Sequence, residues 1–252
     1  ILFNATLVRC MLEQGIYEIP RFNMDFPDIV ALEGGDFLET LQDCYARYGR
    51  DECIVITRSN KRANRYNNGI RYNVLYAEEE IESGDMLMVV KNNYYFTEHD
   101  KECPMSFIAN GDIACLKRLR RFEELYGFHF AEATLSFGDY DDTELTCKVL
   151  LDTLSSESPS LTREESTRLF YEVEKDYLDI RSKLKRFKEI RENPHFNALQ
   201  IKFAYAVTCH KAQGGQWKAE PMTRDMLRWL YTALTRATER LYLVNFDERF
   251  FE

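Results

Sequence analysis

The sequence lacks long apolar runs and any recognisable targeting segment. No stretch approaches the roughly eighteen consecutive apolar residues that cross a bilayer as a helix. The N-terminal part also lacks a charged stretch followed by an apolar run and a small-residue cleavage site, so no secretion signal is visible. We therefore expect no membrane association and a cytoplasmic location.

Paired cysteines are also missing. The seven cysteines are scattered singly, without a Cys-x-x-Cys pair. This spacing argues against a zinc ribbon and against a disulfide framework, so we expect no metal site and a reducing compartment.

An overall excess of basic residues is absent, because the formal net charge is −9. Nucleic-acid binding ordinarily requires a basic surface, so this average disfavours it. The average nevertheless hides two basic stretches. The segment RSNKRANRYNNGIR (Arg58 to Arg71) contains five cations and no acid, and KRLRR (117 to 121) contains four cations. The net charge therefore does not exclude local contacts between these stretches and phosphates.

The first 75 residues alternate between helical and extended patterns, which is typical of an α/β fold. NATLVRCMLEQG predicts a helix that stops at Gly15, and GGDFLETLQDCYARYG predicts a second that ends at Gly49. ECIVIT predicts a buried strand. From about 76 to 140 the pattern changes to short extended runs, MLMVVKNNYYF, SFIANGDIACLKRL and FHFAEATLSFG, separated by Gly and Asn. These runs predict the hairpins of a small barrel.

A capping box, Thr162 with Glu165, predicts the start of a long helix. Its apolar positions step by three and four, which we interpret as packing: Phe170, Val173, Tyr177, Ile180, Leu184 and Phe187. After Pro194 the sequence predicts a strand (QIKFAYAVT), a helix (MTRDMLRWLYTALTRATE) and a closing strand (RLYLVNF). The expected fold class is α/β, with one domain formed by residues 1–75 and 198–252. An inserted domain, 76–197, holds a barrel at about 80–140 and a long helix at about 162–190.

The segment TCHKAQGGQW (208 to 217) follows a predicted strand. Ligands of open α/β sheets bind at the carboxyl ends of strands. Gly214 and Gly215 allow backbone N–H groups to approach a phosphate closely. Five neighbours add polar side chains: Thr208, His210, Lys211, Gln213 and Gln216. An ordinary polar loop would have the same composition.

A thiol enzyme that uses Cys209 with His210 is disfavoured, because adjacent strand residues point to opposite faces.

Two further segments suit phosphate chemistry. Arg236 lies near the end of a helix whose Leu227, Leu230 and Leu234 share a buried face, although a helix dipole alone would favour a cation there. The segment after ECIVIT begins a helix with Ser59 or Asn60 as its cap. Free N–H groups at a helix start, with cations nearby, suit a phosphodiester backbone. A solvated basic face is the alternative interpretation.

The pattern T-x-H-K-x-Q-G-x-x-W followed by L-Y-T-A-x-T-R-A-x-x-x-L-x-L-V resembles motifs V and VI of superfamily 1 DNA helicases. The likeness is to the RecD-like branch, which includes the exodeoxyribonuclease V alpha subunit. IVITRSNKRANRYNNGIR and ILFNATLVR are similar to other segments of that family's second motor domain. The resemblance covers nearly the whole chain but only the C-terminal half of a helicase. It implies a RecA-like motor domain, with a discontinuous and mostly parallel sheet, that carries an inserted Src-homology-3-like barrel.

The resemblance implies a role for each matching residue. Arg236 would be the catalytic arginine finger that reaches the γ-phosphate of ATP held by the other motor domain. The nucleotide cleft would also include Gln213, Gly214, Gly215 and Gln216. Single-stranded DNA would contact Arg58, Ser59, Asn60, Lys61, Arg62, Thr208, His210 and Lys211. The implied partners are single-stranded DNA, an N-terminal RecA-like domain of the same protein, and nuclease or helicase subunits of a repair complex.

Two family features are absent from the sequence. It contains no G-x-x-x-x-G-K-[ST] and no acidic Walker B strand, so ATP and Mg²⁺ would be held by the other motor domain. We therefore expect this chain alone to be inactive as an ATPase. The family also has a further strand where KAEP here follows Trp217.

The alternative hypothesis is a non-catalytic module for single-stranded nucleic acid, with Tyr94, Tyr95 and Phe96 on the barrel as stacking platforms.

Overall fold

The computed structural model describes residues 1–100, 103–209 and 224–251. The chain divides into two compact units, Ile1–Ala63 with Val207–Glu252, and Asn64–Ala206. The division therefore falls near 63 and 206 rather than near 75 and 198. The cause is that most of helix α3 (Asn60–Asn73) and the whole of strand β7 (Leu199–Phe203) belong with the barrel.

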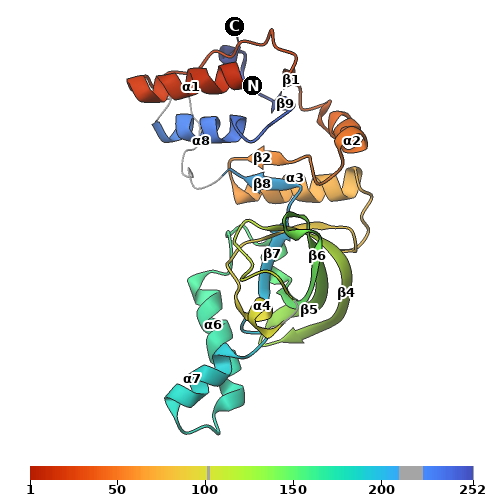
Figure 1. Cartoon of the computed structure of the whole chain (residues 1–252), viewed down its shortest axis with the longest axis vertical. Helices are drawn as coiled ribbons and strands as arrows, with labels where there is room; N and C mark the ends of the chain where they lie inside the picture. Colours follow the sequence, from red (N-terminus) through yellow and green to blue (C-terminus); the bar gives the residue numbers. More distant parts are fainter. Residues whose placement is uncertain (101–102, 210–223, 252) are drawn as a thin grey trace. The chain divides into compact units, whose positions relative to one another are not determined.

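The first unit contains both helices that the sequence predicts near the N-terminus (Figure 1). Helix α1 (Leu2–Gln14) ends at Gly15, which takes a left-handed conformation with φ of 69°. A residue without a Cβ adopts this conformation at little cost, so the glycine ends the helix. Helix α2 (Phe37–Tyr48) ends at Gly49. Both predicted helices and their glycine stops are confirmed.

Four short strands of this unit form two separate pairs. Strand β1 (Ile29–Leu32) runs parallel to β9 (Leu241–Val244), and β2 (Val55–Thr57) pairs with β8 (Ala206–Thr208). The mixed α/β character is confirmed. Within the described residues, however, no ladder joins the two pairs into the continuous sheet expected of a RecA-like domain.

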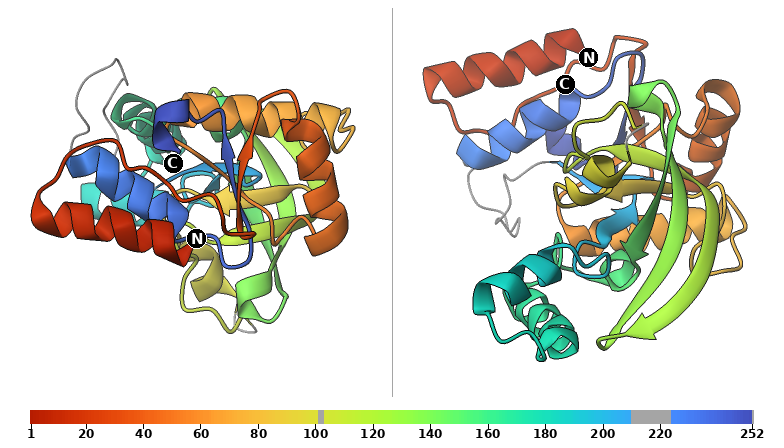
Figure 2. Two further views of the ribbon diagram at one scale, coloured as in Figure 1. Left: turned by 90° about the horizontal axis from the view of Figure 1, so that it is seen from above. Right: turned by 60° about the horizontal axis from the view of Figure 1, so that its bottom comes forward.

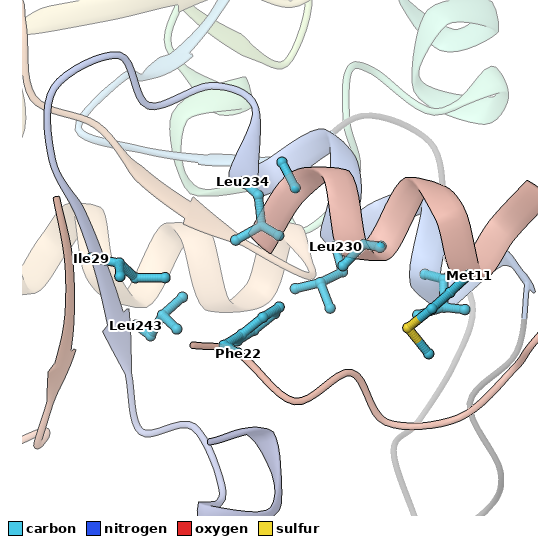
Figure 3. Close-up of a cluster of buried hydrophobic side chains, with 9 residues drawn as sticks. Met11, Phe22, Ile29, Leu230, Leu234 and Leu243 are labelled. Atoms are coloured by element: carbon cyan, nitrogen blue, oxygen red, sulfur yellow. The ribbon is translucent and has the colours of Figure 1, made fainter. Parts of the chain in front are cut away.

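The core of the first unit lies between helix α8 (Arg224–Leu234), helix α1 and the β1–β9 pair. Figure 3 shows side chains from these elements pointing toward one another. Leu227, Leu230 and Leu234 of α8 are 0%, 2% and 1% exposed, which confirms the predicted buried face. Burial of such a side chain stabilises the fold by about 1.5–3 kcal/mol. This core therefore fixes the position of α8.

The second unit is built on a closed barrel of five strands (Figure 1). Neighbouring strands are antiparallel except for the parallel pair β6–β7. The strands are β3 (Met86–Val89), β4 (Ile113–Leu125), β5 (Phe128–Phe137), β6 (Thr143–Leu150) and β7.

The inserted barrel is therefore present, but it extends beyond residue 140. No strand was predicted at β6, and the residues of β7 were assigned to the other domain. The apolar run QIKFAYAVT was predicted as one strand, yet the chain bends at Ala204 and Tyr205 between β7 and β8. One run thus supplies two strands in two different sheets, so the single-strand prediction was wrong.

The sequence predicted an extended segment around Tyr94 to Phe96. The structure instead has the short helix α4 (Tyr95–His99) there. Two hydrogen bonds of the first turn explain the change. The Phe96 N–H donates to the Asn93 side-chain oxygen at 3.3 Å, and the Thr97 hydroxyl donates to the Tyr94 carbonyl at 3.0 Å. Short polar side chains at these positions favour a helix start over a strand.

The predicted long helix at 162–190 is two helices, α6 (Arg163–Glu174) and α7 (Lys183–Arg191), beside the barrel (Figure 2). The Thr162–Glu165 capping box is confirmed in both directions. Helix α6 gives way to a 3-10 turn at Lys175–Tyr177, and α7 begins at the extended residue Ser182, whose side chain accepts a hydrogen bond from the Lys185 N–H. The apolar stripe breaks with it, since Leu184 is 83% exposed.

Helix α3 is fastened to the barrel by buried polar side chains on one face. Asn67, which is 2% exposed, donates to the carbonyls of Phe203 and Ala206 at 3.2 and 2.8 Å. Its own oxygen accepts from the Ala206 N–H at 2.7 Å. One turn later, Arg71 forms a two-pronged ion pair with Asp85, with both N to O distances 2.9 Å. These contacts fix α3 against the segment that enters β8.

Candidate nucleic-acid and nucleotide site

The ends of β2 and β8 meet, although the two strands are far apart in the sequence. The Cys209 N–H donates to the Thr57 carbonyl at 3.1 Å. The Thr57 hydroxyl lies 3.3 Å from the Val207 carbonyl and 3.2 Å from the Ser59 carbonyl, which places it as a donor to both. The basic segment after β2 and Thr208 at the end of β8 were predicted separately to face DNA. The structure places them beside each other.

Ser59 caps helix α3, as one of the two predicted alternatives. Its hydroxyl oxygen accepts from the Arg62 N–H at 3.3 Å, and its carbonyl accepts from the Ala63 N–H at 2.9 Å. The first turn of α3 contains no acidic residue, and Lys61 and Arg62 are exposed. The segment Arg58–Arg62, here called the β2–α3 turn, therefore presents cations at the positive end of a helix dipole.

Arg58 is half-buried within this turn. Burial lowers the pKa of its guanidinium, and the nearby positive charge of Arg62 lowers that pKa further. Arginine still keeps its charge near neutral pH, because its ordinary pKa lies far above the neutral range. Two like charges are thus held close together, an arrangement that a bound anion would stabilise.

The side chains at the end of β8 divide between two environments. Thr208 is half-buried, whereas Cys209 is 5% exposed and its thiol lies 3.6 Å from the Trp229 carbonyl on α8. Cys209 thus packs toward the core helix, which argues against a reactive thiol.

Arg236 lies two residues after Leu234, the last buried leucine of α8. Its side chain is exposed, and its backbone N–H donates to the Ala233 carbonyl at 3.2 Å. The buried face of α8 therefore holds the backbone while the guanidinium stays accessible. The assignment of this residue as an arginine finger stays a prediction.

Several predicted site residues lie outside the described residues: His210, Lys211, Gln213, Gly214, Gly215 and Gln216. The departure from the family pattern around KAEP lies there as well. The described part of the site is therefore the β2–α3 turn, Thr208 and Arg236.

Sequence reasoning missed Thr57. Its hydroxyl and carbonyl join β2, β8 and the start of α3 in one set of hydrogen bonds. The available signal was a polar residue at the end of the apolar run ECIVIT, directly before the basic stretch.

The aromatic residues proposed as stacking platforms have protein partners. Tyr94 stacks on Phe107 with ring centroids 5.0 Å apart, and the Tyr95 hydroxyl donates to the Glu192 carbonyl at 3.0 Å. Tyr95 and Phe96 are half-buried. Tyr95 and Phe96 thus contribute to packing around α4, whereas Tyr94 stays 51% exposed.

The basic run KRLRR lies on β4, where its four cations are exposed. One of them, Arg121, forms an ion pair of 3.1 Å with Glu132 on the neighbouring strand β5. This run and the β2–α3 turn belong to different units.

Within residues 1–100, 103–209 and 224–251, no three His, Cys, Asp or Glu side chains gather where they could hold a metal ion. In the same ranges no helix has the length and apolar character needed to cross a membrane.

Comparison with known proteins gives one family. Residues 203–244 match the UvrD-like helicase C-terminal domain. No curated protein matches the chain. The family match supports a superfamily 1 helicase C-terminal region. It spans β8, α8 and β9, and so includes Thr208 at the end of β8 and Arg236 just after α8.

Proposed function

We propose that this chain is the C-terminal portion of an ATP-dependent DNA helicase of the RecD-like branch, which moves along single-stranded DNA. The observation that carries the proposal is the meeting of the β2–α3 turn with the end of β8. Two segments that resemble different parts of the helicase DNA track are joined there by the 3.1 Å hydrogen bond from Cys209 to Thr57. The family match at 203–244 supports the helicase assignment independently.

The β2–α3 turn suits the DNA backbone rather than the bases. Lys61 and Arg62 offer charge at a helix start, and Ser59 adds a hydroxyl beside them. Contacts to phosphates position a protein on DNA without reading its sequence. Binding is therefore expected to be independent of sequence, and the net charge of −9 keeps it weak.

Arg236 suits the second role, because charge stabilisation in phosphoryl transfer can come from an arginine on another domain. The sequence has no Walker A motif, so in this proposal ATP and Mg²⁺ are held by an N-terminal motor domain. Hydrolysis then requires closure of the two domains. If the two motor domains bind the single-stranded DNA alternately as they close and open, the protein moves along the DNA.

Charge reversal in the β2–α3 turn is expected to weaken single-strand binding. The double variant Lys61→Glu with Arg62→Glu removes two phosphate partners, so the slope of log affinity against log salt should become shallower by about 1.4. Fluorescence anisotropy with a labelled oligodeoxythymidylate measures both quantities. The control is Lys183→Glu with Lys188→Glu, an equal charge change on α7. Equal affinity of the two double variants would remove the turn from the DNA track.

The non-catalytic binding module makes a different prediction. Its affinity for single-stranded DNA should be the same with and without ATP, even in a protein that carries both motor domains. The half-buried rings of Tyr95 and Phe96 give this alternative no support, and Tyr94, which is 51% exposed, is the one ring of the three that is open to a base.

A further inference from the structure

Two surface cavities formed by described residues of the unit Asn64–Ala206 have linings of opposite charge. The larger, with a volume of about 590 Å³, has five carboxylates in its lining: Glu79, Glu80, Glu123, Glu124 and Asp152. Such a lining repels phosphates. The smaller, with a volume of about 260 Å³, is lined by Lys91 and Arg163, and no acidic residue is among its described lining residues. Only the smaller of these two therefore suits an anionic ligand.

The smaller cavity, here called the α6 cavity, lies between helix α6 and strand β7. Arg163 is the first residue of α6, Gln200 lies on β7, and Lys91 follows β3. Both cations are exposed, so their charges can reach a ligand at the mouth of the cavity.

Gln200 supplies a fixed donor in this cavity. The residue is 7% exposed, and its side-chain oxygen accepts from the Leu161 N–H at 2.9 Å. This bond sets the orientation of the amide, because only the oxygen can accept. The amide nitrogen, which can only donate, belongs to a residue that lines the cavity.

Aromatic rings form another wall of the cavity. Phe170 meets Phe196 with centroids 6.0 Å apart and Tyr171 with centroids 5.6 Å apart, both edge to face. Tyr171 is 58% exposed, whereas Phe170 and Phe196 are half-buried. Phe170, which packs on Phe196, thus supports a tyrosine ring that remains accessible, as a stacking surface for a flat ligand requires.

We propose that the α6 cavity binds one nucleotide unit of a single-stranded nucleic acid. Its phosphate lies near Lys91 and Arg163, its base stacks on Tyr171, and the Gln200 amide donates to an oxygen or nitrogen of the base or sugar. The choice of ligand rests on the proposed helicase function. The α6 cavity shares no residue with the β2–α3 turn and would be a second contact with the single-stranded nucleic acid.

Photo-crosslinking locates this contact directly. Oligodeoxythymidylate that carries 5-iododeoxyuridine is irradiated with the 252-residue chain, and the crosslinked peptides are identified by mass spectrometry. The proposal expects crosslinks in the tryptic peptide 169–175, which contains Phe170 and Tyr171. Crosslinks confined to peptides outside 161–200 would overturn it.

Binding by variants tests the two parts of the ligand. Lys91→Glu with Arg163→Glu should weaken binding of the oligonucleotide at least about tenfold, and the salt slope should become shallower by about 1.4. Tyr171→Ala should weaken binding at least about fivefold, while Tyr171→Phe, which keeps the ring, should not. The control is again Lys183→Glu with Lys188→Glu. Circular dichroism verifies that each variant is folded.

The outcomes separate this site from the β2–α3 turn and from a site for free nucleotides. If Lys91→Glu with Arg163→Glu binds as tightly as the control, the proposal fails. The proposal also fails if thymidine monophosphate binds with micromolar affinity and prevents the oligodeoxythymidylate from binding. If Lys61→Glu with Arg62→Glu abolishes tight binding through the β2–α3 turn, crosslinks that persist in peptide 169–175 support the α6 cavity, and loss of these crosslinks counts against it.

Discussion

Arg236→Ala is expected to lower ATP turnover of the complete helicase by about a thousandfold or more, with little change in ATP affinity. The reason is that an arginine finger contacts the transferring phosphoryl group mainly in the transition state. Arg236 is suited to this role because it is exposed directly after the buried face of α8. Single-strand-stimulated ATPase rates and equilibrium ATP binding measure the two effects separately.

Two further variants sharpen this test. Arg236→Lys should not restore turnover, because lysine lacks the planar, two-pronged guanidinium. Arg228→Ala removes an exposed arginine on α8 itself and should leave turnover unchanged. Near-normal hydrolysis by Arg236→Ala would reduce Arg236 to a cation that interacts with the helix dipole.

Arg71→Met is expected to lower the free energy of unfolding by about 3–5 kcal/mol, the largest stability effect that we expect. Asp85 is 3% exposed and accepts from Arg71, from the Tyr205 hydroxyl at 2.9 Å and from the Glu82 N–H at 2.9 Å. Removal of Arg71 leaves a buried carboxylate without its counter-charge. Urea unfolding followed by circular dichroism measures the loss.

Matched variants separate burial from charge. Arg121→Met breaks the 3.1 Å pair with Glu132, but the Arg121 side chain is 78% exposed, so little stability should be lost. Arg71→Met combined with Asp85→Leu should recover part of the loss, because both charges are then absent. An equal effect of Arg71→Met and Arg121→Met would show that the buried pair does not secure α3.

The sequence predicted features that depend on local chemistry. Gly15 and Gly49 end their helices, and Thr162 with Glu165 starts another, because these signals involve residues only a few positions apart. Features that depend on distant partners were missed. Whether Leu199–Phe203 joins the barrel or the other unit depends on β3 and β6, and no periodicity in the strand itself records that choice.

The candidate site shows the same limit. Motif resemblance selected Thr208, Arg236 and the β2–α3 turn one at a time, but the hydrogen bond that joins the strand ends depends on how the chain folds. The sequence did not predict a role for Gln200, because that role depends on its hydrogen bond with Leu161 and on the cavity that it lines.

In the proposed function, this chain supplies one half of a two-domain motor and cannot hydrolyse ATP alone. Titration of residues 1–252 with Mg·ATP in a calorimeter, combined with an ATPase assay in the presence of oligodeoxythymidylate, tests it most directly. We predict negligible ATP binding and no turnover, because the backbone cradle and the phosphate-binding lysine of a Walker A motif are absent from the sequence. Micromolar binding of Mg·ATP, or turnover stimulated by the single strand, would show that the chain is a complete enzyme and would contradict the claim.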